Sequence, residues 1–174
     1  ATNYIKKYNN NTKTVYGGFD EKLFNQRYRS QENNKKIIIG YAGNARIWQG
    51  LNFLLEALYS VSNKNFELRI LCSEKKWKLD EKYYYFAKLC APLLHKEVPK
   101  FLVECDILVI PRLKNMVNEL SFPSKLMEYL AMGKPVIASK TSDCHRIIHH
   151  GVDGLLYDPG DKKDFIKKLE LLWD

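Results

Sequence analysis

The chain has 174 residues and a formal net charge of +8, with 45% hydrophobic and 28% charged residues. This composition is that of a folded globular protein and excludes a disordered or fibrous chain. No apolar run approaches the roughly 20 residues that span a bilayer, which favours a soluble, cytoplasmic protein. The positive charge predicts an anionic partner, which is a nucleic acid, a membrane surface or a phosphorylated small molecule.

Residues 1–34 are rich in Asn, Lys, Tyr and Gln, and predict a lead-in or linker segment outside the hydrophobic core. From residue 35 onward, apolar runs alternate with helical patterns, so we expect one folded domain over residues 35–174. The absence of an initiator methionine indicates a piece of a longer protein or a processed chain. A lead-in of this length is too short to form a second domain.

Several short apolar runs end at glycine, proline or a polar residue, as strands buried on both faces do. They are KKIIIGYAG (35–43), FELRILC (66–72), DILVIP (106–111), KPVIAS (134–139) and DGLLYD (153–158). The aromatic segment YYYFAKLC (83–90) is compatible with a sixth strand.

Amphipathic segments between these runs predict helices. They are GLNFLLEALYSV (50–61), HKEVPKFLVEC (95–105), SFPSKLMEYLAM (121–132), TSDCHRIIHHG (141–151) and GDKKDFIKKLELLW (160–173). Ser121 is expected to cap the third helix, Gly133 to end it, and Asp161 to open the last one. Strands that alternate with helices predict an α/β fold with a mostly parallel sheet and helices on both faces.

In such a sheet, ligands bind beyond the carboxyl ends of the strands. The loop GNARIWQG (43–50) joins a strand to a helix there, and its glycines would let backbone N–H groups approach an anion. The candidate residues in it are Gly43, Asn44, Arg46 and Gln49. Its spacing fits neither a dinucleotide fingerprint nor a P-loop. The alternative is that the two glycines serve only the geometry of the turn.

A second candidate loop follows DILVIP and contains Arg112 and Glu119, and the next helix carries Lys125 and Glu128. Lys125 and Glu128 are three residues apart and share a helix face. The lysine could bind a phosphate, and the carboxylate could accept two hydrogen bonds from a vicinal diol. The alternative is a surface ion pair of little energetic weight.

Five blocks occur in a fixed order along the chain. They are YGGFDEKLF (16–24), GYAGNARIWQGLNFLLEAL (40–58), VPKFLVECDILVIP (98–111), FPSKLMEYLAMGKPVIAS (122–139) and HHGVDGLLYDPGD (149–161). Together they resemble the C-terminal half of two-domain GT-B glycosyltransferases, with the best match to glycosyltransferase family 4. The resemblance implies a Rossmann-like, three-layer α/β/α domain, one half of a GT-B fold. This domain would hold a UDP- or GDP-linked sugar and would need no metal or other cofactor.

The same resemblance assigns roles to single residues. Glu128 matches the second glutamate of the family's E-x7-E motif, which binds the ribose hydroxyls. The backbone N–H groups around Pro123, Ser124 and Lys125 match the segment that cradles the distal phosphate. Residues 91–95 resemble the loop that touches the nucleobase, with Leu93 against the ring.

The sequence also departs from the family pattern. The position eight residues before Glu128 holds Leu120, so the first acid of the motif is missing or displaced to Glu119. Asn44 and Gln49 occupy the positions of an arginine and a lysine that bind the diphosphate. Arg46 or Lys125 would then supply the compensating charge, with Arg112 as a further nucleotide-binding candidate. Glu119 and Lys125 are the catalytic candidates.

The sequence thus predicts the donor-binding domain of a retaining glycosyltransferase of polysaccharide or glycoconjugate biosynthesis. It would transfer a hexosyl unit to a glycan or lipid-linked acceptor held by a separate N-terminal domain, so the isolated chain should transfer little. A peripheral contact with the inner membrane face through the lysines of residues 160–173 is a further hypothesis. The alternatives are an inactive nucleotide-sugar-binding module, an epimerase of the same fold, or a basic nucleic-acid-binding domain.

Overall fold

The computed structural model describes residues 2–28, 36–62, 65–141 and 143–172. Its sheet contains β1 (Ile37–Gly43), β2 (Phe66–Cys72), β3 (Ala87–Cys90), β4 (Ile107–Ile110), β5 (Val136–Ser139) and β6 (Leu155–Tyr157). All neighbouring strands pair in parallel, in the order β3-β2-β1-β4-β5-β6. The chain therefore builds outward from β1 to β3, crosses back to β4 and builds outward again to β6. The predicted α/β fold with a parallel sheet is confirmed.

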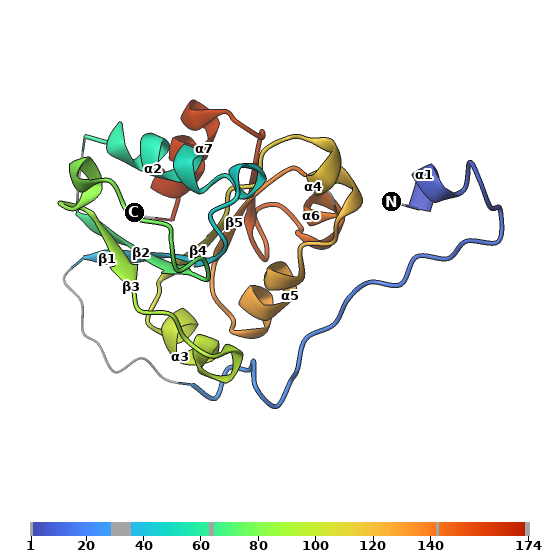
Figure 1. Cartoon of the computed structure of the whole chain (residues 1–174), viewed down its shortest axis with the longest axis horizontal. Helices are drawn as coiled ribbons and strands as arrows, with labels where there is room; N and C mark the ends of the chain where they lie inside the picture. The colour runs from blue at the N-terminus through green and yellow to red at the C-terminus, as the bar shows by residue number, and fades with distance from the viewer. Residues whose placement is uncertain (1, 29–35, 63–64, 142, 173–174) are drawn as a thin grey trace.

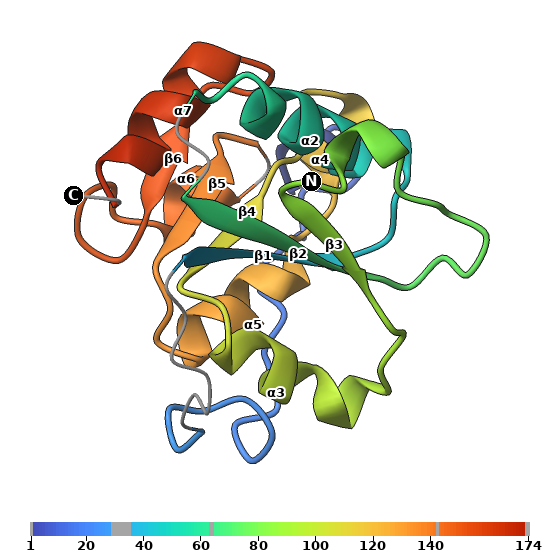
Figure 2. The ribbon, with the colours of Figure 1, turned by 90° about the vertical axis from the view of Figure 1, so that its left-hand side faces the viewer.

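Helices cover both faces of this sheet (Figures 1 and 2). The helices α2 (Leu51–Tyr59) and α7 (Lys162–Glu170) lie on one face, and α3 (Val98–Val103) and α5 (Ser124–Ala131) lie on the other. The short helices are α1 (Thr2–Ile5), α4 (Met116–Leu120) and α6 (Cys144–Ile147), together with the 3₁₀ turns η1 (Ile47–Gln49), η2 (Glu81–Tyr83) and η3 (His95–Glu97). The three-layer Rossmann-like arrangement is thus present.

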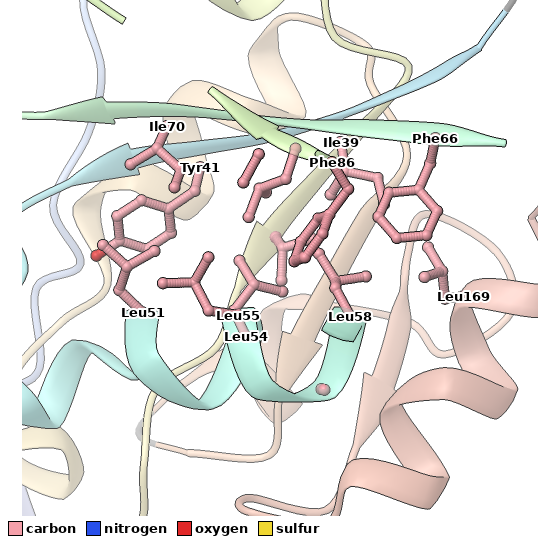
Figure 3. Close-up of a cluster of buried hydrophobic side chains, with 14 of the residues drawn as sticks. Ile39, Tyr41, Leu51, Leu54, Leu55, Leu58, Phe66, Ile70, Phe86 and Leu169 are labelled. Atoms are coloured by element: carbon pink, nitrogen blue, oxygen red, sulfur yellow. The ribbon is translucent and has the colours of Figure 1, made fainter. Parts of the chain in front are cut away.

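The two faces of the sheet have separate hydrophobic cores. In Figure 3, leucines of α2 point at β1 and β2, with Leu54 and Leu58 among the side chains that contact the sheet. Successive residues of β1 serve different cores, because Ile39 and Tyr41 belong to this cluster and Ile38 belongs to the one under α3 and α5. Burying each large apolar side chain contributes about 1.5–3 kcal/mol, so the helical spacing in residues 51–58 fixes α2 on the sheet.

The lead-in segment contributes to the second core, which differs from the expectation for residues 1–34. Its N-terminal part extends away from the domain (Figure 1), but Phe24 is only 1% exposed and packs in the cluster that contains Leu126 and Tyr129 of α5. Leu23 and Tyr28 pack against the same cluster. Residues 1–34 are mostly polar, so their composition does not predict that Phe24 is buried or which residues it contacts.

Local structure differs from the sequence prediction at three places. The strand predicted in YYYFAKLC (83–90) is β3 and begins only at Ala87, because Tyr83 ends η2 and Tyr84 and Tyr85 follow it as exposed turn residues. The loop after β4 contains α4, whose N-cap Asn115 accepts a hydrogen bond from the N–H of Asn118 at 2.9 Å. The helix α5 begins at Ser124 with Pro123 at its N-cap position, so Ser121 does not cap it.

Two predicted helix boundaries are confirmed. Asp161 caps α7, since its carboxylate accepts a hydrogen bond from the N–H of Asp164 at 3.0 Å. Gly133 follows the C-cap of α5 with a φ of 67°, which is the left-handed conformation expected of a terminating glycine.

Gly50 has the least space for a side chain among the glycines that the structure describes. It stands between η1 and α2 with a φ of 76°, and a Cβ atom on it would lie 1.7 Å from the carbonyl oxygen of Pro111. The loop after β1 and the loop after β4 therefore touch through backbone atoms at this point. Only glycine fits there, for reasons of both space and conformation.

We expect Gly50→Ala to lower the free energy of unfolding by about 3 kcal/mol or more, because the strained φ and the clash with Pro111 add. The matched control is Gly151→Ala, at a φ of 83° with open space around the added Cβ. This control should cost only the left-handed penalty of about 1–2 kcal/mol. Urea unfolding of both variants measures the difference, and equal losses would contradict the close approach.

Candidate functional site

The candidate site lies where the strand order reverses, between β1 and β4 at their carboxyl ends. Two loops meet there, residues 44–50 after β1 and residues 111–123 after β4. The carbonyl of Trp48 accepts hydrogen bonds from the N–H of Leu113 at 3.1 Å and from Nδ2 of Asn118 at 2.6 Å. The same amide of Asn118 also donates to the carbonyl of Leu113 at 2.6 Å. Asn118, which is fully buried, thus fixes the two loops to each other.

Tyr129 of α5 occupies the point where β1 and β4 separate. The ladder between these strands pairs only Ile39 with Ile107 and Gly40 with Leu108. Beyond it, the Tyr129 hydroxyl accepts a hydrogen bond from the N–H of Ala42 at 3.0 Å and donates one to its carbonyl at 3.3 Å. Burial raises the pKa of Tyr129 above its usual range, which keeps the hydroxyl protonated. This contact fixes the position and rotation of α5.

Lys125 lies one helical turn before Tyr129 and points at the end of β1. Its Nζ donates to Oε1 of Gln49 at 3.3 Å and lies 4.9 Å from the centre of the Tyr41 ring. A Cβ atom on Gly43 would lie 2.3 Å from the same Nζ, so the missing side chain of Gly43 makes room for the ammonium group. Burial, together with the nearby charge of Arg112, lowers the pKa of Lys125 to about 8.

Arg112 brings a second positive charge to the same place. It is 6% exposed, and its Nη1 donates to the carbonyl of Ser121 at 3.2 Å. Its Nε is buried and has no hydrogen-bond partner among the described residues. Burial lowers the pKa of Arg112 from its ordinary value.

Neither cation forms an ion pair with a carboxylate within the part of the chain that the structure describes. Buried positive charge without a counter-charge is costly. The lysine ammonium and the arginine guanidinium are also the two side chains that bind phosphate groups best. The arrangement of Lys125 and Arg112 therefore favours an anion, such as a phosphate or a diphosphate, at the end of β1.

Glu128 points at a different loop from Lys125. Its Oε1 lies 3.1 Å from Nε2 of His95, which follows β3, and the Glu128 side chain is 22% exposed. The His95 ring lies 5.3 Å from the ring of Phe24, centre to centre. One face of α5 thus presents a cation toward the loop after β1 and a carboxylate toward the loop after β3.

The remaining residues of the phosphate prediction have other contacts. The carbonyl of Asn44 accepts a hydrogen bond from the Tyr41 hydroxyl at 2.5 Å. Pro123 has no N–H group, and the N–H of Ser124 donates to the carbonyl of Phe122 at 3.1 Å. The side chains of Lys125 and Arg112 are therefore better placed to bind an anion than the backbone N–H groups of residues 123 and 124.

Three further candidate residues, like those just described, lie outside the cluster formed by Gly43, Gln49, Arg112 and Lys125. Arg46 is exposed, forms an ion pair with Glu74 at 3.8 Å and lies 5.3 Å from the centre of the Trp48 ring. Glu119 is exposed on α4. Leu93 is exposed in the loop after β3, two residues before His95.

Sequence reasoning missed four residues that shape the site, namely Tyr41, His95, Asn118 and Tyr129. Tyr129 follows Lys125 by four residues, so helical spacing was the one signal that could have joined them. His95 ends the segment 91–95 that resembles the nucleobase loop, but nothing local to it predicts its contact with Glu128, and its side chain is 66% exposed. Tyr41 and Asn118 carry no local signal, because their partners lie in other elements.

Among the described residues, no group of three or more His, Cys, Asp or Glu side chains is placed to hold a metal ion. Likewise, no helix in the described ranges has the length and apolar character that a membrane span requires.

Comparison with known proteins gives a consistent result. The sequence model of the family described as Glycosyl transferases group 1 matches residues 36–174. The chain is 28% identical over 166 residues to the sulfoquinovosyl transferase SQD2 of Arabidopsis thaliana, which covers 89% of this chain and 32% of that protein. The chain therefore spans about a third of this curated relative.

Solved structures of low sequence identity share the fold. Sucrose-phosphate synthase from Thermosynechococcus elongatus superposes with a TM-score of 0.74 at 17% identity, over 98% of this chain and 46% of that chain. The Anabaena protein HepE, in complex with UDP and glucose, gives a TM-score of 0.67 at 17% identity, over 93% of this chain and 47% of that chain. Both matches show a common domain that makes up about half of the larger molecule.

We expect Tyr129→Phe to lower the free energy of unfolding by about 1–3 kcal/mol, because the N–H and C=O of Ala42 lose their partner. The urea midpoint should fall while its slope stays constant. Tyr84→Phe, at an exposed tyrosine, is the matched control and should leave the midpoint unchanged. An equal midpoint for both variants would rule out a structural role for the Tyr129 hydroxyl.

We also expect the affinity for inorganic pyrophosphate to fall about tenfold between pH 7 and pH 9, because Lys125, with its pKa of about 8, loses its proton over this range. Isothermal titration calorimetry at several pH values measures it. Lys125→Arg keeps its charge at every pH used and controls for the titration of pyrophosphate itself. Identical pH dependence in both proteins would show that Lys125 does not bind the anion.

Proposed function

The chain belongs to the family of group 1 glycosyl transferases, and we propose that it is the domain of such an enzyme that binds a nucleoside diphosphate sugar. The observation that carries this proposal is a pair of cations at the switch point of the sheet, the partly buried Lys125 and the buried Arg112, neither of which forms an ion pair with a carboxylate of the described residues. A diphosphate supplies the negative charge that these groups lack. The same fold binds UDP in the Anabaena relative, which supports a nucleotide ligand.

Glu128 would bind the ribose of this nucleotide. It lies one turn after Lys125 on the same helix, so a diphosphate held by Lys125 would place the adjoining ribose near it. The oxygen not engaged by His95 can accept hydrogen bonds from the two vicinal hydroxyls. The nucleobase would then lie toward the loop after β3, where Leu93 is exposed.

Lys125 compensates for the uncharged residues in the loop after β1. The resemblance to glycosyltransferase family 4 places a lysine at the position of Gln49, and Gln49 instead accepts a hydrogen bond from Lys125 Nζ. An ammonium group supplied by α5 thus reaches the location that the family pattern assigns to a charge from the loop. Residue 49 is uncharged here, but the positive charge of Lys125 still lies near the end of β1.

In the reaction, the bond between the anomeric carbon of the hexose and the distal phosphate oxygen breaks, and negative charge develops on the diphosphate. Lys125 and Arg112 would stabilise that charge in the transition state. The hydroxyl of a glycan or lipid-linked acceptor would attack from the face that the phosphate leaves and would pass its proton to the departing phosphate oxygen, so configuration is retained. The acceptor would bind to a separate domain. We expect the isolated chain to bind nucleotide and to transfer little sugar.

A second candidate function is a nucleotide-sugar-binding module without turnover. It is favoured by the position of Glu119, which stays exposed on α4 rather than joining Lys125 and Glu128. The two functions differ in whether a protein that carries this domain together with an acceptor domain consumes a labelled donor. Sugar transfer by such a protein would exclude the inactive module.

We expect UDP or GDP at a hundred times its dissociation constant to stabilise the chain by about 2.7 kcal/mol, which raises its melting temperature. Lys125→Ala should reduce the increase in melting temperature caused by the nucleotide and that caused by inorganic pyrophosphate, because both ligands carry the diphosphate. Glu128→Ala should reduce the shift with the nucleotide only, since pyrophosphate has no ribose.

Lys163→Ala is the control for a general loss of positive charge, because Lys163 is exposed on α7. Its nucleotide shift should equal that of the unaltered chain. A chain that no nucleoside diphosphate stabilises, or a Glu128→Ala variant with an undiminished shift, would contradict the proposal.

A further inference from the structure

We propose that the lead-in segment is part of the nucleotide site, because Phe24 positions His95 and His95 positions the carboxylate of Glu128 for the ribose. This inference rests on the proposed function and adds two residues to it. Phe24 lies outside residues 36–174, the range that the family model covers. His95 acts as a positioning residue here, since it contacts Glu128 rather than the reacting atoms.

The lead-in segment contacts the residues just before and just after α5. Before the helix begins, the ring of Tyr16 lies 5.7 Å from that of Phe122, and a Cβ atom on Gly17 would lie 3.1 Å from the Phe122 ring. Beyond the end of the helix, a Cβ atom on Gly133 would lie 2.9 Å from the side chain of Gln26. Residues 16–26 thus run beside the helix that carries Lys125 and Glu128.

Phe24 is the anchor of this segment. It is buried in the same cluster as Leu126 and Tyr129, the inward-facing residues of α5. The Phe24 ring contacts the ring of His95, with the two ring planes inclined by 54° at a centre distance of 5.3 Å. Such a tilted aromatic contact restricts the rotation of the histidine ring.

The restricted ring then holds one oxygen of Glu128. The contact between His95 Nε2 and Glu128 Oε1 measures 3.1 Å and joins residues from two separate elements, η3 and α5. The backbone next to His95 is held as well, since the N–H of Leu94 donates to Oε2 of Glu97 at 3.2 Å. A partly exposed glutamate without such a partner would sample several rotamers. Fixing one of these rotamers on binding would cost affinity. With Oε1 held, Oε2 faces the ligand in one orientation.

The test compares two nucleotides that differ only in the hydroxyls that Glu128 binds. The ligands are UDP or GDP, whichever stabilises the chain, and its 2′,3′-dideoxy form. We expect His95→Phe, which keeps a ring on Phe24 and removes the hydrogen bond, to weaken the normal nucleotide about three- to tenfold. The same variant should leave the affinity for the dideoxy nucleotide unchanged. Calorimetric dissociation constants measure both effects.

Two further variants separate the roles of the two residues. His95→Gln places an amide N–H near the position of Nε2 and should restore most of the lost affinity. Phe24→Leu keeps an apolar side chain in the cluster but removes the ring, and it should show the same selective loss in a weaker form. Because both residues act through Glu128, Phe24→Leu combined with His95→Phe should lose no more than His95→Phe alone. Tyr8→Leu, at an exposed lead-in tyrosine, is the control.

The outcomes distinguish this inference from the proposed function. If the unaltered chain binds neither nucleotide, the proposed function fails, and the inference fails with it. If the hydroxyls contribute to binding but His95→Phe has no effect, only the inference is overturned. Equal losses for the normal and the dideoxy nucleotide would also overturn it, because they would indicate a general structural effect rather than positioning of Glu128.

Discussion

The site depends on the separation of β1 and β4 toward their carboxyl ends. Once the ladder ends at Gly40 and Leu108, the N–H and C=O of Ala42 need another partner, and the Tyr129 hydroxyl provides it. This contact ties α5 to the end of β1 in one rotation. Lys125 and Glu128 then point to the loops after β1 and β3 as a consequence of helical geometry.

The site that results holds two positive charges, and neither forms an ion pair with a carboxylate in the described ranges of the chain. Lys125 and Arg112 are placed there at the cost of desolvation, which lowers the pKa of both groups. Gly43 admits the ammonium group because it has no side chain, and Asn118 holds the two loops in contact. Such a preorganised pair gains most when a bound anion replaces the missing counter-charge. Phe24 packs in the same hydrophobic cluster as Leu126 and Tyr129 and so also supports α5.

Prediction from sequence succeeded where the signal is local. The isoleucines of β1 and the leucines of α2 gave the correct elements, because burial on both faces and helical spacing leave a direct pattern. It failed at Ser121, which is near the start of α5 but does not cap it, since Pro123 shifts that start to Ser124. It also missed α4, whose single turn and a half is stabilised by Asn115 and by the contact of Asn118 with the other loop.

The family, the alternation of strands and helices, and the presence of Lys125 and Glu128 on one helix face can all be inferred from the amino-acid sequence. Which side chains meet these two residues is known only from the folded arrangement of the loops. Lys125 contacts Gln49 from 76 positions away, and Glu128 contacts His95 from 33 positions away. The physical reason is that periodicity reports how a segment meets water and core, whereas a contact between two loops depends on how the whole sheet is wound.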